Sequence, residues 1–215
     1  AHDITITENA NLETIQFPSL TTANSIFLFG NQSLTLFEAN ELISINNELV
    51  LEDNDGMETF GGLSQLEEIN GRFYVAYNNS LTTIEAIPNL TTVNGIVSIV
   101  DNDDLSSIDG FSGLTSVNEL LIEANDVLDS LEAFSALTSA GEIIIDSNNN
   151  ITTLDGLDSV TEITDFIGIS NNGLLESITA LGSLDVSPAE IEIINNSSLC
   201  QDSVNSFLNL YPTAN

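Results

Sequence analysis

The chain has 215 residues, with 33 Asp and Glu against one Lys or Arg, which gives a formal net charge of -32 at pH 7. Proteins that bind nucleic acid or anionic membranes attract phosphates with clusters of Lys and Arg. Arg72 is the only such side chain here, so we expect neither kind of partner. High charge with low hydrophobicity is typical of disorder, but 42% of this chain is hydrophobic and it is expected to fold.

A nine-fold repeat begins at Ile4 and runs almost to the end of the chain. Each copy starts with two apolar residues two positions apart, the period of a strand with one buried face. The pairs are Ile4/Ile6, Ile26/Leu28, Leu49/Leu51, Phe73/Val75, Val97/Ile99, Leu120/Ile122, Ile143/Ile145, Ile167/Ile169 and Ile191/Ile193. An asparagine follows three residues after each pair, at Asn9, Asn31, Asn54, Asn78, Asn102, Asn125, Asn148, Asn172 and Asn196. The spacing predicts nine coils of 22 to 24 residues.

The rest of each coil carries further apolar rows and one row of small residues. An apolar residue stands three positions after each asparagine, and more follow on the return path. One coil cannot bury its own apolar side, whereas stacked neighbours can. We expect the asparagine amides to point inward at a corner and to bond backbone groups of their own and adjacent coils.

The C-terminal segment departs from the repeat. Residues 1–200 are predicted to form the solenoid, and residues 201–215 a helical cap of the same domain. Asp202 or Ser203 is the expected N-cap. Val204, Phe207, Leu208 and Tyr211 are expected to close the core, and Pro212 to end the helix. The first coil shows no comparable cover.

The repeat unit resembles the receptor L-domain family of leucine-rich-repeat solenoids. The pattern Leu-x-x-Ile-x-Gly-(Leu/Phe)-x-x-Leu-x-x-(Ile/Val), followed by the strand and its asparagine, is clearest in residues 105–125 and 151–175, and other coils add a glycine two residues later. The resemblance implies an all-β, right-handed parallel β-solenoid and an extracellular, non-enzymatic recognition role. Family members include ligand-binding domains of growth-factor receptors, fungal wall proteins and surface proteins of marine bacteria, so no ligand is identified.

Few residues here suit catalysis. Nucleophilic catalysis needs a base held against a serine or cysteine, and His2 stands at the N-terminus, where chains are usually mobile. Cys200, the single cysteine, is expected to be a buried structural thiol, with an interchain disulfide as the alternative. We therefore expect no enzyme activity and no catalytic cofactor.

Two acidic corners supply hard oxygen ligands of the kind that calcium prefers. They contain Asp53 and Asp55 in one coil and Asp101, Asp103 and Asp104 two coils later. Calcium is a possible ligand of these residues, and the alternative is that they simply face solvent. An excess of acid is tolerated best where salt screens it, which indicates a saline extracellular or cell-surface setting.

The outward positions of the strands suggest the function. A solvent-facing strand row should be mostly polar, but apolar and aromatic residues gather over coils two to five, at Phe27, Phe29, Val50, Tyr74, Tyr77 and Val100. The sequence predicts an adhesion or recognition module that binds protein or glycan there, although strand propensity alone also favours such residues. The alternative function is a structural subunit that stacks end to end into a filament, using its uncovered first coil.

Overall fold

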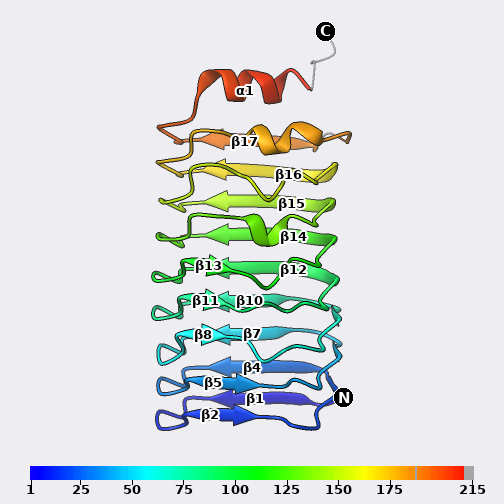
Figure 1. Cartoon of the computed structure of the whole chain (residues 1–215), viewed down its shortest axis with the longest axis vertical. Helices are drawn as coiled ribbons and strands as arrows, with labels where there is room; N and C mark the ends of the chain where they lie inside the picture. Colours follow the sequence, from blue (N-terminus) through cyan, green and yellow to red (C-terminus); the bar gives the residue numbers. More distant parts are fainter. Residues whose placement is uncertain (187, 211–215) are drawn as a thin grey trace.

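The computed structural model describes residues 1–186 and 188–210. It is an all-β solenoid of about 8 turns with one short C-terminal helix (Figure 1). Its main sheet stacks parallel strands in chain order: β1 (Asp3–Thr7), β4 (Ser25–Phe29), β7 (Leu49–Glu52), β10 (Phe73–Ala76), β12 (Thr92–Val100), β14 (Ser116–Glu123), β15 (Ser139–Asp146), β16 (Glu162–Ser170) and β17 (Glu190–Ile194). The predicted ninth coil is not completed, because the chain leaves β17 for a helix.

Short strands and turns form the return path of each coil. One group pairs β2 (Thr14–Gln16) with β5 (Leu36–Glu38), and another joins β8 (Thr59–Phe60), β11 (Thr83–Ile84) and β13 (Ser107–Ile108). A third group, β3 (Thr22–Ala23), β6 (Ser44–Ile45) and β9 (Glu68–Ile69), joins the main sheet at β12. Two 3-10 helices lie on the return path, η1 (Glu132–Phe134) and η2 (Thr179–Ser183).

The strand register keeps like residues of successive coils on top of one another. Ile26 pairs with Ile4 below it and with Leu49 above it, and the same offset continues through Phe73 and Val97. All of these except the end residue Ile4 are fully buried. The predicted inward pairs are therefore confirmed. A slip of the register by one residue would turn these apolar side chains to solvent.

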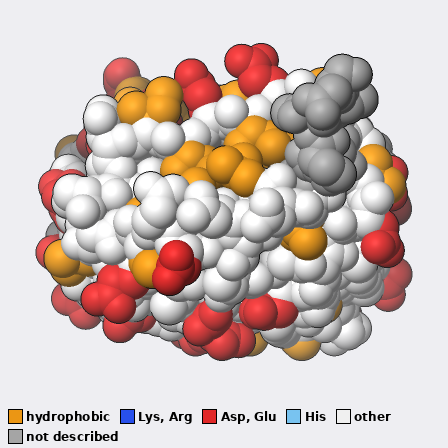
Figure 2. Space-filling view, turned by 90° about the horizontal axis from the view of Figure 1, so that it is seen from above, with side chains coloured by type: hydrophobic (Ala, Val, Ile, Leu, Met, Phe, Trp, Pro, Cys, Tyr) orange, Lys and Arg blue, Asp and Glu red, His pale blue; other side chains and the backbone are white. Residues whose placement is uncertain are grey.

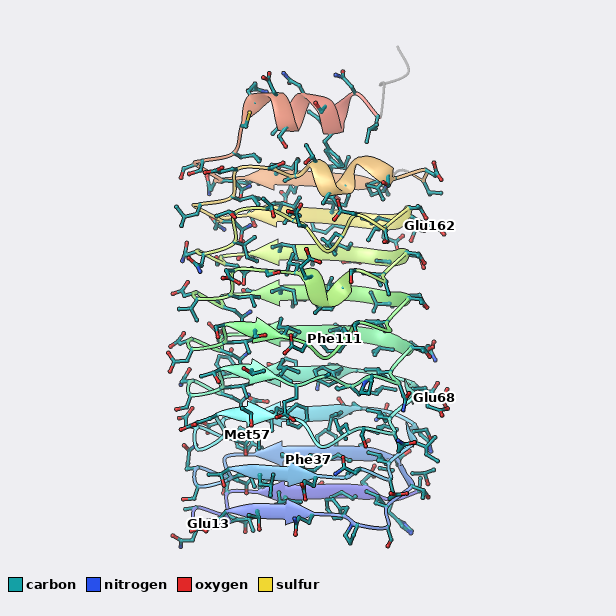
Figure 3. All side chains as sticks on the ribbon, viewed as in Figure 1. Glu13, Phe37, Met57, Glu68, Phe111 and Glu162 are labelled. Atoms are coloured by element: carbon teal, nitrogen blue, oxygen red, sulfur yellow. The ribbon has the colours of Figure 1, made fainter. Side chains whose placement is uncertain are left out.

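A column of phenylalanines fills the core between the main sheet and the return path. Phe111 is in edge contact with Phe73, with ring centroids 5.1 Å apart, and stacks on Phe134 at 5.2 Å. Figure 3 labels two members of the column, Phe37 and Phe111. Phe111 and Phe134 belong to an inward row that the sequence analysis did not separate, with Leu63, Ile87, Leu157 and Leu181. These side chains tie neighbouring coils together with apolar contacts.

The asparagine ladder is confirmed. The seven asparagines from Asn31 to Asn172 are all fully buried. At Asn102 the backbone N–H and Nδ2 both donate to Asn125 Oδ1 at 3.2 Å. Nδ2 also donates to the carbonyls of Val75 and Val100, at 3.2 and 3.0 Å. Each amide thus joins three coils, and the ladder runs in one direction along the stack.

The residue before each ladder asparagine has a left-handed backbone. The φ angles are 54° at Asp53, 56° at Tyr77, 49° at Asp101 and 54° at Ala124, with Gly30 at 67° in the same position. This conformation reverses the chain after the strand, so that the asparagine amide turns inward. It costs a non-glycine residue about 1–2 kcal/mol, and the ladder bonds stabilise it.

The helix α1 (Gln201–Leu208) closes part of the C-terminal end. Its N-cap is Cys200 and makes no side-chain cap bond, so the predicted caps Asp202 and Ser203 were wrong. Ser203 instead accepts a hydrogen bond from the Ile178 N–H at 2.9 Å, which docks the helix on η2. Phe207 enters the core as predicted, but Leu208 is 46% exposed. Tyr211 and Pro212 lie outside the described residues.

Between β17 and α1 a groove of about 430 Å³ remains open, lined by residues that include Ile191, Ile193, Leu199 and Val204. Seen from this end, hydrophobic side chains form a central band and carboxylates surround it (Figure 2). The helix therefore covers the last coil only in part. No helix within the described ranges is long and apolar enough to cross a membrane.

Candidate functional site

The outward side of the main sheet, from β4 to β16, is the candidate site and is called the strand face below. Side chains alternate along each strand, so the residues between buried pairs such as Ile26 and Leu28 point outward. Because the register is constant, they form rows across the strands. The central row contains Phe27, Val50, Tyr74, Ser98, Leu121, Ile144 and Gly168.

Three of the six predicted binding residues are direct neighbours in this row. Val50 pairs with Phe27 on one side and Tyr74 on the other, and these larger side chains leave it only 5% exposed. The two aromatic residues are half-buried. The amino-terminal half of the strand face is therefore a shallow apolar surface.

The other three predicted residues lie beside the central row and not in it. Phe29 and Val100 lie in the next row, with Glu52 and the fully buried Ala76 between them. Tyr77 stands at the corner after β10 and is 46% exposed. The predicted group was drawn from two outward rows, four and two residues before the asparagine, and the strand register places these rows side by side on the sheet.

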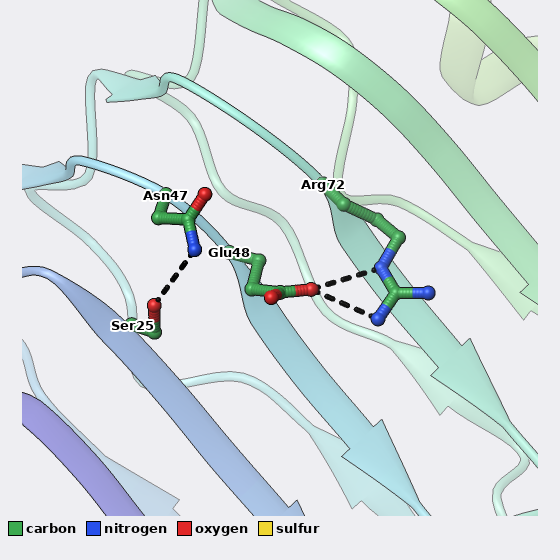
Figure 4. A network of polar contacts seen from close by, with 4 residues as sticks. All are labelled: Ser25, Asn47, Glu48 and Arg72. Carbon is green, nitrogen blue, oxygen red and sulfur yellow. Dashed lines mark hydrogen bonds and ion pairs between the residues drawn. The ribbon is translucent and has the colours of Figure 1, made fainter.

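The sequence analysis missed Arg72, which lies on the same face. Its Nε and Nη2 donate to Glu48 Oε2 at 3.1 and 2.8 Å, and its guanidinium carbon lies 4.6 Å from the centre of the Tyr74 ring. Beside this pair, Asn47 Nδ2 donates to Ser25 Oγ at 3.1 Å (Figure 4). Burial, followed by the nearby Glu52 carboxylate, raises the pKa of Tyr74. The sequence could have placed Arg72 on this face, because it stands two residues before Tyr74 at the start of β10 and alternate residues of a strand point to the same side.

The other half of the strand face, on β14 to β16, combines apolar and acidic rows. Leu121 pairs with Ile144 in the central row and both are half-buried. The Phe166 ring lies over Gly168, where an added Cβ would come within 2.7 Å of the ring. The apolar row therefore continues past the residues that the sequence analysis selected.

Carboxylates stand directly opposite each other on either side of this apolar row. Glu119 pairs with Glu142, and Glu123 pairs with Asp146. Burial and then the Glu142 charge raise the pKa of Glu119. Burial, then Asp146 and Asp101, raise the pKa of Glu123. Like charges directly opposite in a sheet are destabilising, so the opposed carboxylates in this half of the face repel each other.

The acidic corners show no assembled metal site. Asp53 and Asp101 occupy the same corner on coils separated by one, with Tyr77 in the intervening position. Asp55 Oδ1 accepts the Asn79 N–H at 2.9 Å, and Asp53 Oδ1 accepts from Gln32 at 3.0 Å. In the described part of the chain, no three or more His, Cys, Asp or Glu side chains gather to hold a metal ion. Calcium binding through Asp53, Asp55, Asp101, Asp103 and Asp104 stays a prediction.

The histidine and the cysteine lie at opposite ends of the solenoid. His2 is exposed beside β1. Cys200 is also exposed, so the prediction of a buried thiol was wrong. Leu199 points toward the core, and the next residue therefore faces out where α1 begins.

No family model, curated protein or solved structure matches the chain. The resemblance to receptor L-domains therefore stays an expectation drawn from the repeat.

Proposed function

We propose that this chain is a non-catalytic recognition or adhesion module that binds a protein or glycan through its strand face. The observation that carries the proposal is the apolar central row, which crosses six neighbouring strands from Phe27 to Ile144 with only Ser98 as a polar member. Exposed sheet faces are usually polar, and apolar patches with aromatic residues commonly mark interaction sites.

We also propose that the solenoid is right-handed and of the leucine-rich type, and that the protein works outside the cell or at its surface. The repeat consensus supports the first, because its leucine position is apolar and its asparagine is present in every coil, and its corner glycine position holds Gly or Ala in the second to eighth coils. The net charge of -32 supports the second. Salt at about 1 M shortens the Debye length to about 3 Å, so a saline medium would remove most repulsion between surface carboxylates.

The test is binding to arrays of glycans and extracellular proteins, compared between variants. The double variant Tyr74→Ser/Phe29→Ser should lose at least about tenfold in affinity for any ligand found, since central aromatic contacts dominate such interfaces. The matched control is Ile43→Ser/Leu174→Ser, which removes two exposed apolar side chains away from the strand face. Unchanged affinity in the first variant, with circular dichroism showing the native fold, would refute the assigned face.

Self-stacking into a filament is the second candidate function. Within the described residues β1 pairs only with β4, so its other edge is open, and Ile4 and Ile6 are half-buried there. Open strand edges are pairing surfaces. Light scattering over a concentration series, with calcium and with chelator, tests this function. A monomer at every concentration would exclude it, and loss of large species in chelator would link assembly to calcium.

A further inference from the structure

The chemistry of the partner can be inferred from the strand face, and this inference rests on the proposed recognition function. A third outward row lies on the strand face, one residue before each inward pair. This row contains Glu48, Arg72, Ile96, Glu119 and Glu142 in successive coils. Glu48 and Arg72 form an ion pair across neighbouring strands. Three coils beyond this pair, Glu119 and Glu142 stand in the same relation, but both carry negative charge.

The Arg72 site shows how this face holds a guanidinium. A carboxylate from the adjacent strand binds it at 2.8 Å, and the ring of Tyr74, two residues along the strand, supports it from below. The positions that correspond to Tyr74 beside Glu119 and Glu142 are Leu121 and Ile144, which are apolar and half-buried. A cation between the two glutamates would therefore meet two carboxylates and an apolar floor.

No cation of the chain itself fills this position. Arg72 is the only Lys or Arg, and it is engaged with Glu48. The second acidic pair differs, because Asp146 already accepts hydrogen bonds from Ser147, Ser170 and Asn171. Glu123 is therefore the available carboxylate on that side of the apolar row.

We infer that β14 and β15 of the strand face bind an extended basic protein segment. One Arg or Lys of the segment lies between Glu119 and Glu142, an apolar side chain covers Leu121 and Ile144, and a second cation reaches Glu123. Glu119 and Glu123 are four residues apart on one strand, or about 13 Å. An extended segment places its residues i, i+2 and i+4 on one side with the same spacing, so the expected motif is cation-x-apolar-x-cation.

Charge complementarity favours this partner over a glycan. An acidic glycan would be repelled by the four carboxylates, and a neutral glycan would leave the opposed pairs unrelieved. A cation between Glu119 and Glu142 forms charge-assisted hydrogen bonds, which are stronger than neutral ones. It also removes the repulsion between two like charges in register.

The test uses a fluorescein-labelled peptide, Gly-Arg-Thr-Leu-Thr-Arg-Gly, and an isomer with adjacent arginines, Gly-Arg-Arg-Thr-Leu-Thr-Gly. Binding to the full chain is measured by fluorescence anisotropy at about 0.1 M NaCl, where the Debye length is about 10 Å. We expect the spaced peptide to bind more tightly than its isomer. Glu119→Gln/Glu142→Gln should weaken it by about tenfold or more, as two charged hydrogen bonds are lost.

The matched control is Glu13→Gln/Glu58→Gln, which makes the same change in net charge at exposed corners outside the strand face. Its effect on peptide affinity should be less than about twofold, because only long-range attraction changes. Equal weakening by both double variants would show general attraction to an acidic protein and overturn the inference. Equal affinity for the two peptides, or no binding to the native chain, would also overturn it.

Failure here is distinguishable from failure of the proposed function. If array ligands bind and depend on Tyr74 and Phe29 while the spaced peptide does not bind, only the basic-segment inference falls. If an array identifies a glycan whose affinity does not change in Glu119→Gln/Glu142→Gln, the partner class assigned here is likewise wrong. Gln keeps the size of Glu at these half-buried positions, so both variants are expected to fold, and a thermal melt checks this.

Discussion

Replacing Asn102 with Ala tests whether the ladder amides stabilise the solenoid. The side chain is fully buried, and its Oδ1 accepts the Asn78 N–H at 3.2 Å while its Nδ2 donates to the Val75 carbonyl. Truncation leaves both backbone groups without these partners in the core. An unsatisfied buried group costs about 1–3 kcal/mol, so the two together cost about 2–6 kcal/mol. A folded domain typically has a free energy of unfolding of about 5–15 kcal/mol, so this loss is a large part of it.

The matched control is Asn9→Ala at the exposed end of the ladder. Asn9 Nδ2 donates to the Thr7 carbonyl and to Asn31 Oδ1, but water reaches this corner and can replace the lost amide. We expect a loss of less than about 1 kcal/mol. Urea unfolding followed by circular dichroism and tyrosine fluorescence measures both variants. If their free energies of unfolding differ by less than about 1 kcal/mol, the ladder is not a main source of stability.

The remaining predictions concern backbone strain and charge. Ala124→Gly should raise the free energy of unfolding by about 0.5–1 kcal/mol, because φ is 54° at Ala124. Gly30→Ala should lower it by about the same amount, because φ is 67° at Gly30. If the two variants shift the melting temperature in the same direction, this reasoning is wrong. Glu119→Gln/Glu142→Gln should raise the free energy of unfolding by up to about 1 kcal/mol near neutral pH. Since the folded-state pKa of Glu119 is raised, the repulsion is present above that pKa and disappears as the pH falls toward the unfolded value of about 4.3. Urea titrations at neutral and acid pH check this, and a gain that persists when the carboxyls are protonated would argue against charge as its cause.

The coil architecture was predictable because its signals are local and repeated. The apolar pairs and the asparagine recur in every coil, and a residue that must be buried in all of them leaves a visible row. The left-handed residue before each asparagine leaves no such row. Glu8, Tyr77, Ala124 and Ser147 adopt it as well as Gly30, Asp53, Asp101, Asn171 and Asn195, so residue type alone does not mark the position.

The candidate site was predicted only in part. Phe27, Val50 and Tyr74 follow from strand alternation alone, because they are neighbours in the central row. Arg72 and Phe166 were missed because they belong to a third outward row, one step further from the asparagine. The exposure of Cys200 depends on the residue at which α1 begins, and no repeated pattern marks that point.

The ladder bonds also determine how the chain can change in length. Each buried amide contacts only its own coil, the coil before it and the coil after it, at separations of 2 and of 23 to 27 residues along the chain. Stability in such an arrangement is a sum of coil terms and nearest-neighbour terms. Duplication or loss of one complete coil would therefore rejoin equivalent partners and leave every other interface as it was.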